Sequence, residues 1–203
     1  MTAPILLVTA SVLGLLSFFE PCTIATHTLF SARAHARTAP ACCRELIVLW
    51  LTRSLLVVGL LVVAVVLTTP PDWGAALPSI ILAVMASVYI VSRFVYIPVP
   101  HLAFHKILPG GARLPQAVQL GLTLPACTLP LFVIVLGLSV TLDSYPLAVA
   151  GGLLFAGLFT LPTAVTVVTG LSAAGQRFLK ASAFATPYIT GVLLYGAAAY
   201  LLF

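Results

Sequence analysis

The chain has 203 residues, of which 62% are hydrophobic and only 6% are charged, and its formal net charge is +5. Soluble globular domains contain about 25% charged residues, so this composition excludes a soluble domain and predicts an integral membrane protein in contact with the lipid bilayer. The apolar runs are continuous rather than alternating, which favours transmembrane helices over barrel strands. The positive charge is explained by basic cytoplasmic loops and does not indicate nucleic-acid binding.

The chain length is typical of about six membrane helices joined by short loops, in a single membrane domain over residues 1–203. We expect the six helices at residues 4–30, 46–67, 75–96, 116–140, 145–171 and 181–203. The first range is expected to remain in the mature protein, because it lacks the basic start of a signal peptide. It should bend near Pro21. Trp50 and Arg53, at the start of the second helix, should lie at the membrane interface, with Arg53 reaching into water.

The basic residues are distributed unevenly among the loops. All nine lysines and arginines lie in the loops 31–45, 97–115 and 172–180 or at adjoining helix ends: Arg33, Arg37, Arg44, Arg53, Arg93, Lys106, Arg113, Arg177 and Lys180. The positive-inside rule therefore places these loops in the cytoplasm and both termini outside. Residues 1–97 and 116–203 then form two three-helix halves of opposite orientation. An inverted repeat of this kind places the functional site near the midplane, on interrupted helices.

Two of the four cysteines lie in corresponding predicted helices. Cys22 is found in Glu-Pro-Cys-Thr, and Cys127 in Pro-Ala-Cys-Thr-Leu-Pro. Packing would explain two such cysteines, but these motifs favour a redox pair, since thiol–disulfide exchange needs an attacking thiolate and a resolving thiol. A proline that begins a half-helix before each cysteine would place the sulfur at a helix N-terminus, which favours the thiolate.

Residues around the two cysteines have expected supporting roles. Pro21, Pro125 and Pro130 should interrupt the helices, because proline lacks the N–H that a helix requires. Thr23 and Thr128 could then donate hydrogen bonds to freed carbonyls or to the sulfurs.

Glu20 is the only acidic residue deep within a predicted helix. An intramembrane carboxylate is by default a functional hypothesis, and Glu20 could accept a thiol proton or bond a freed backbone group. The alternative is that a bend places Glu20 in cytoplasmic water.

The remaining candidates are weaker. Cys42 and Cys43 are adjacent in a predicted loop. They could be incidental thiols that stay reduced in the cytoplasm, or they could bind a soft metal or act as an accessory thiol relay. His101 and His105 should be solvated. Possible hinges for a conformational change are Pro162, Pro187 and Gly191.

On these motifs the chain resembles the CcdA family, membrane electron transporters related to the central domain of DsbD. The resemblance implies that Cys22 and Cys127 alternate between dithiol and disulfide without a bound cofactor. Cytoplasmic thioredoxin would reduce the pair, and the pair would reduce a thioredoxin-like protein outside the cytoplasmic (inner) membrane, often for cytochrome c maturation. Alternating access by an elevator-like movement would expose the pair to each side. One departure is Ala25, where the family often has proline.

Two other functions remain open at this point. The cysteines could bind soft metal ions in a transporter, because thiolates select such metals. The chain could also carry small neutral molecules, with incidental cysteines. Replacing Cys42 and Cys43 by serine should separate the redox interpretation, which predicts retained function, from the metal interpretation, which predicts its loss.

Overall fold

The fold is mostly helical in the computed structural model, which describes residues 2–67, 80, 83–84, 86–87, 90–91, 102–106, 111–142, 144–170 and 172–202. The helices are α1 (Thr2–Phe18), α2 (Pro21–His35), α3 (Ala39–Leu67), α5 (Gln116–Gly121), α6 (Leu129–Leu142), α7 (Tyr145–Thr169) and α8 (Ala173–Leu202). The short elements are β1 (Leu102–Ala103), η1 (Phe104–Lys106), η2 (Gly111–Arg113), β2 (Thr123–Leu124) and η3 (Ala126–Thr128). The predicted helical class is confirmed, whereas the two short strands were not expected.

Within the described ranges, α3 and α7 are each long and apolar enough to cross a membrane. A third span would be formed by α1 and α2 together, which meet at an angle of 71°. The bend follows from the sequence, because Glu20 is extended (φ −66°, ψ 138°) and Pro21 opens the next helix without an N–H to donate. The prediction of a bend near Pro21 is confirmed.

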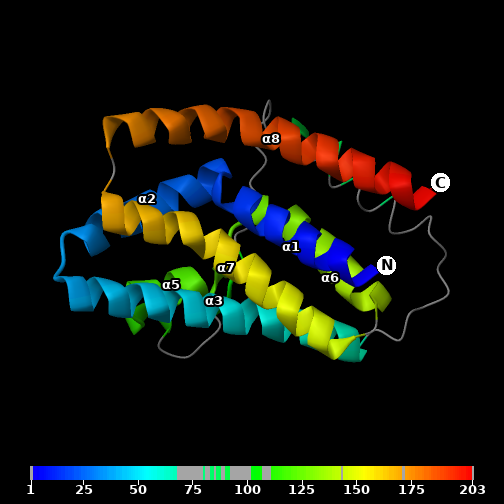
Figure 1. Cartoon of the computed structure of the whole chain (residues 1–203), viewed down its shortest axis with the longest axis horizontal. Coiled ribbons are helices and arrows are strands. Elements are labelled where there is room, and N and C mark those ends of the chain that lie inside the picture. The colour runs from blue at the N-terminus through cyan, green and yellow to red at the C-terminus, as the bar shows by residue number, and fades with distance from the viewer. Residues whose placement is uncertain are drawn as a thin grey trace.

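Helix α7 lies between α1 and α3 at the centre of the described bundle (Figure 1). The contacts of α7 with α1 and with α3 are both close, because a glycine lies at each helix–helix interface. A Cβ atom added at Gly14 of α1 would lie 2.5 Å from the carbonyl oxygen of Phe155, and one added at Gly152 of α7 would lie 2.8 Å from Val58 of α3. Small residues allow helix backbones to approach in this way in membrane proteins.

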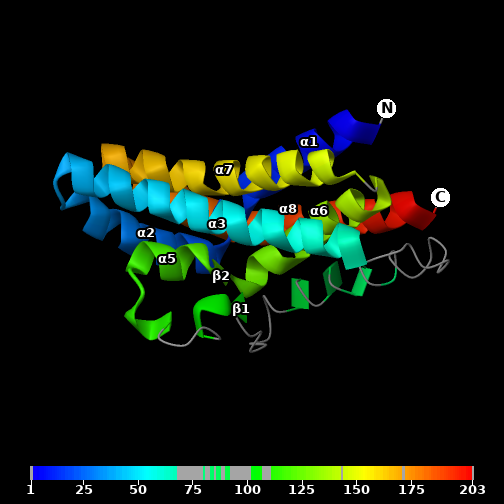
Figure 2. The ribbon, with the colours of Figure 1, turned by 90° about the horizontal axis from the view of Figure 1, so that it is seen from below.

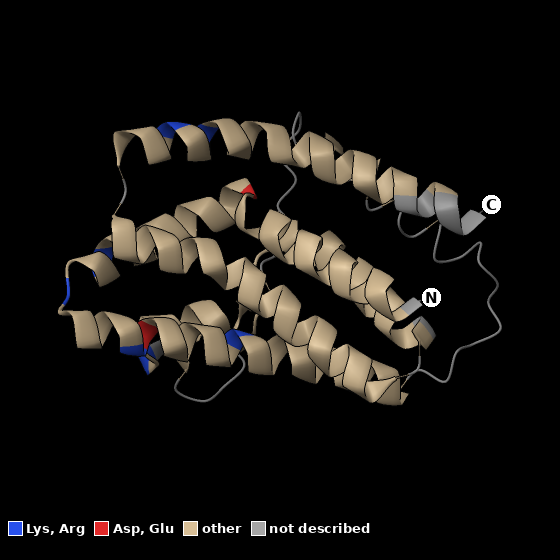
Figure 3. Ribbon diagram, viewed as in Figure 1, with Lys and Arg blue, Asp and Glu red and all other residues tan. Residues whose placement is uncertain are grey.

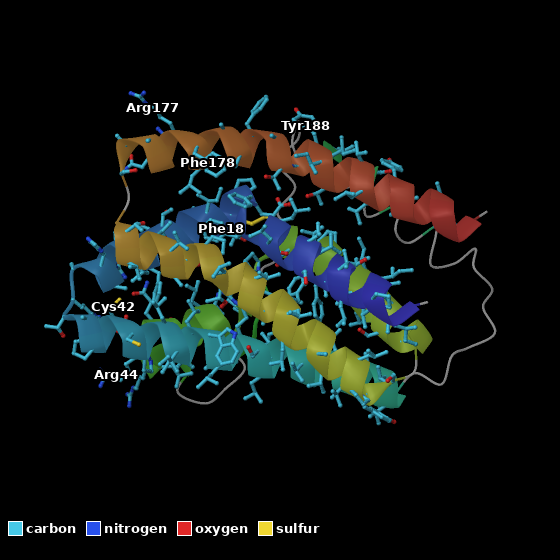
Figure 4. All side chains as sticks on the ribbon, in the orientation of Figure 1. Phe18, Cys42, Arg44, Arg177, Phe178 and Tyr188 are labelled. Carbon is cyan, nitrogen blue, oxygen red and sulfur yellow. A yellow bond between two sulfur atoms is a disulfide. The ribbon has the colours of Figure 1, made fainter. Side chains whose placement is uncertain are left out.

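The two cysteine-bearing segments run in opposite directions. From the middle of the molecule α2 extends towards one end and α6 towards the other (Figures 1 and 2). Both termini lie at the end reached by α6. Blue lysine and arginine positions gather toward the opposite end, and the terminal end shows none among the residues described (Figure 3). Arg44 and Arg177 are both at this basic end (Figure 4).

Two predicted loops are shorter than expected. The segment 31–45 contains only a short connection at 36–38, and most of 172–180 belongs to α8. Hydropathy marks where a helix leaves the hydrocarbon, not where the helix ends, and alanine-rich sequence continues the helices beyond that point. Most of the predicted turn and third helix at 68–96 lies outside the described residues, and the positions described there are helical.

Candidate functional site

A disulfide joins Cys22 and Cys127, which are 105 residues apart and have their Cα atoms 6.8 Å apart (Figure 4). Cys22 is the second residue of α2, directly after Pro21. Cys127 lies in η3, which follows Pro125 and leads into α6. A proline therefore opens a helical segment at each cysteine, as predicted. Both cysteine side chains are half-buried.

The irregular backbone before Cys127 makes hydrogen bonds of its own. Strand β2 pairs antiparallel with β1, with Leu124 opposite Leu102. The backbone N–H and the hydroxyl of Thr128 both donate to the carbonyl of Pro125, at 3.0 and 2.8 Å. Buried backbone groups need such partners at membrane depth. Thr128 therefore bonds a carbonyl at the break, that of Pro125, rather than a carbonyl freed by a proline or a sulfur.

The first break is organised differently. The Thr23 hydroxyl is buried and has no hydrogen-bond partner in the part of the chain described, so its predicted bond to a carbonyl or a sulfur is wrong. Thr26, on the exposed side, donates to the carbonyl of Cys22 at 3.2 Å instead. The difference arises because Thr23 lies on the face of α2 that turns into the bundle. Pro130 lies in the first turn of α6, where a missing N–H breaks no helical hydrogen bond.

Glu20 is fully buried between the first break and α8. Its carboxylate accepts a hydrogen bond of 3.0 Å from the hydroxyl of Thr190. The alternative that Glu20 lies in cytoplasmic water is therefore wrong. Its side chain forms no capping bond to α2, and the carboxylate instead links the Cys22 segment to α8.

Arg53 is fully buried, so the prediction that its side chain reaches into water is wrong. One terminal nitrogen, Nη2, lies 3.0 Å from Nε2 of His27, and the other, Nη1, donates to the hydroxyl of Thr160 at 3.1 Å. The guanidinium also lies 4.1 Å above the ring centre of Phe159. The physical reason is that α3 begins at Ala39, so Arg53 falls in the middle of the helix instead of near its start.

His27 completes this buried polar cluster. Its Nδ1 lies 2.5 Å from the hydroxyl of Thr163, and its ring stacks on Phe159 with centroids 5.6 Å apart. Because a guanidinium can only donate hydrogen bonds, Nε2 of His27 accepts from Arg53 and Nδ1 carries the proton. This cluster was not predicted from the sequence. The available signal was a histidine and an arginine in predicted helices that both need interior partners.

The other predicted residues lie away from the disulfide. Cys42 and Cys43 are free thiols in the first turns of α3 and not in a loop, with Cys42 half-buried and Cys43 exposed. His105 is half-buried, with Nδ1 3.2 Å from the hydroxyl of Thr123, and His101 lies outside the described residues. The three predicted hinges lie inside continuous helices, in α7 or α8: Pro162, Pro187 and Gly191.

Comparisons with protein-family models, with curated proteins and with solved structures found no match to this chain. Over the described residues, no group of three or more His, Cys, Asp and Glu side chains could hold a metal ion.

Proposed function

We propose that the protein carries reducing equivalents across the cytoplasmic membrane by thiol–disulfide exchange at Cys22 and Cys127. The observation that carries the proposal is the disulfide itself, which joins cysteines 105 residues apart at the two interruptions of the helical fold. The proposed donor is cytoplasmic thioredoxin, and the acceptor is a thioredoxin-like protein outside, for example one that serves cytochrome c maturation.

The exchange balances without a bound cofactor. A thiolate of reduced thioredoxin attacks one sulfur of the Cys22–Cys127 disulfide, whose S–S bond breaks as a mixed disulfide forms. The second thioredoxin thiol resolves this intermediate, so thioredoxin leaves oxidised and Cys22 and Cys127 become thiols. The same two steps then reduce a disulfide of the outer protein. Two electrons and two protons pass from donor to acceptor in each cycle.

The local structure supports reactivity at both sulfurs. Cys22 lies in the first turn of α2, and Cys127 lies in η3 directly before α6. The unpaired N–H groups at the start of a helix stabilise nearby negative charge, so both positions favour the thiolate. Half-burial leaves each sulfur partly accessible to a partner protein.

Two-sided access would follow from six membrane helices arranged as two inverted repeats. The order of elements supports this arrangement, because η3–α6 and α7 follow Cys127 much as α2 and α3 follow Cys22. The opposite directions of α2 and α6 agree with it as well (Figure 1). The basic end would face the cytoplasm and both termini the outside. Pro162, Pro187 and Gly191 are the proposed points of flexure for alternating access.

The test is a thiol-trapping assay on the protein in membranes. We expect the oxidised protein to resist alkylation at Cys22 and Cys127 until reduced thioredoxin is added, after which both thiols are modified. Thiols that remain separate under every oxidant would exclude the redox function.

Replacing Cys42 and Cys43 together by serine should leave the transfer of electrons unchanged. Both thiols are free at the basic end of α3, and neither takes part in the disulfide. The assay is the thioredoxin-dependent opening of the Cys22–Cys127 disulfide, compared between this variant and the wild type. Loss of function in the serine variant would instead favour soft-metal transport, for which the described residues provide no ligand cluster.

A further inference from the structure

One nitrogen of Arg53 contacts both α2, which carries Cys22, and α5, which precedes the turn that holds Cys127. The Nη2 atom of Arg53 lies 3.0 Å from Nε2 of His27 on α2, and it donates to the carbonyl of Leu120 on α5 at 3.4 Å. Helix α2 carries Cys22, and α5 leads through β2 into the η3 turn that holds Cys127. We propose that Arg53 is a positioning residue that holds these segments at the spacing at which the two cysteines pair. The inference rests on the proposed redox function.

The guanidinium is itself held in place from α7. Its Nη1 donates to the hydroxyl of Thr160 at 3.1 Å, and its central carbon lies 4.1 Å from the centre of the Phe159 ring. The side chain is fully buried, and no ion pair with a carboxylate is found for it in the described ranges. The planar fork of arginine fixes the directions of its donors, so the acceptors on α2, α5 and α7 are held in one arrangement. A single ammonium group cannot reproduce these directions.

A second observation comes from the contact between α5 and α3. A Cβ atom added at Gly121, the residue after Leu120, would lie 2.8 Å from the Cβ of Thr52 and 3.1 Å from the carbonyl oxygen of Leu49. Glycine at 121 therefore lets α5 lie directly against α3 beside Arg53. This close approach brings the Leu120 carbonyl within reach of the guanidinium. A larger residue would move α5 away while leaving the buried charge in place.

Arg53 is proposed to act on the sulfurs only through these segments. Holding two groups in a fixed geometry raises the effective concentration at which they react. If the segments loosen, the reduced thiols spend less time close together, and the disulfide becomes easier to reduce. We expect Arg53→Met to lower the equilibrium constant for disulfide formation about tenfold, which corresponds to a reduction potential about 30 mV more positive.

The experiment equilibrates the protein in membranes with glutathione redox buffers and measures the fraction of Cys22–Cys127 disulfide by thiol trapping. Arg53→Met and Gly121→Ala should both shift the midpoint reduction potential of the Cys22–Cys127 pair to a more positive value. Arg53→Lys should restore part of the wild-type value, since it keeps the charge and one set of donors. Arg44→Met is the matched control, because Arg44 lies on the same helix with an exposed side chain, and it should leave the midpoint unchanged.

The outcomes separate this inference from the proposed function. A wild-type midpoint in both Arg53→Met and Gly121→Ala would overturn the positioning role and leave the redox function intact. An equal shift in Arg44→Met would also overturn it, because the effect would then follow total charge. A wild-type protein that forms no disulfide in any buffer would overturn both. Gly121→Ala keeps the test decisive if Arg53→Met does not accumulate in the membrane, since that variant retains the guanidinium.

Discussion

We expect that replacing either Cys22 or Cys127 by serine abolishes the proposed electron transfer across the membrane. A variant with one thiol of the pair has no Cys22–Cys127 disulfide for reduced thioredoxin to open, so it cannot take up two electrons and pass them to the acceptor. The measurement uses vesicles that contain a disulfide-bonded thioredoxin-like acceptor, with reduced thioredoxin supplied at the basic face. The rate of acceptor reduction should fall to that of vesicles without the protein.

The matched control for this prediction is the serine variant of the two free cysteines. It loses as many thiols as the two single variants together, yet Cys42 and Cys43 lie in the first turns of α3 and form no disulfide. We expect it to transfer electrons at the wild-type rate. Transfer by Cys22→Ser or Cys127→Ser at half the wild-type rate or more would contradict the proposed exchange.

His27→Leu should destabilise the folded protein by about 3 kcal/mol, because removing the imidazole acceptor leaves a buried charged donor without its hydrogen-bond partner. The change removes Nε2 of His27, the acceptor that lies 3.0 Å from the guanidinium of Arg53. The guanidinium stays buried, and its Nη2 then bonds only to the more distant carbonyl of Leu120. It also leaves the Thr163 hydroxyl without the histidine donor. The measurement is reversible unfolding in mixed detergent micelles of increasing denaturing detergent content.

Two comparisons test the cause of this loss. His35→Leu removes an exposed histidine whose Nδ1 contacts the carbonyl of Val167 at 2.7 Å, and it should cost only about 1 kcal/mol. The double change His27→Leu with Arg53→Met removes both partners and should recover part of the stability, because no charge then remains buried without its acceptor. A double variant that is less stable than His27→Leu alone would show that the pair does not account for the loss.

Local sequence predicted the features that depend on neighbouring residues. The bend at Pro21 and the break at Pro125 follow from proline chemistry, which acts on the backbone of the residues around it. The helical class follows from composition. The bounds of α7, predicted at 145–171 and found at Tyr145–Thr169, follow from a continuous apolar run that begins and ends at polar or turn-forming residues. Each of these needs information from one segment only.

Other features were decided by contacts between distant segments. Hydropathy placed Arg53 at a helix end, because an arginine in isolation is most stable where it reaches water. In the fold, acceptors from α2, α5 and α7 surround it, and they are separated from it by up to 107 residues. Likewise Glu20 finds Thr190, 170 residues away, and β2 pairs with β1.

The sequence by itself determined that the chain is helical, strongly apolar and interrupted at two proline–cysteine motifs, because hydrophobicity and proline geometry are properties of short segments. Only the tertiary structure decided that the two motifs meet in a disulfide, and that Arg53 and His27 lie buried beside the segments that carry them. The physical reason is that the cost of burying a polar group depends on which partners the rest of the fold supplies. Those partners come from helices far apart in the chain.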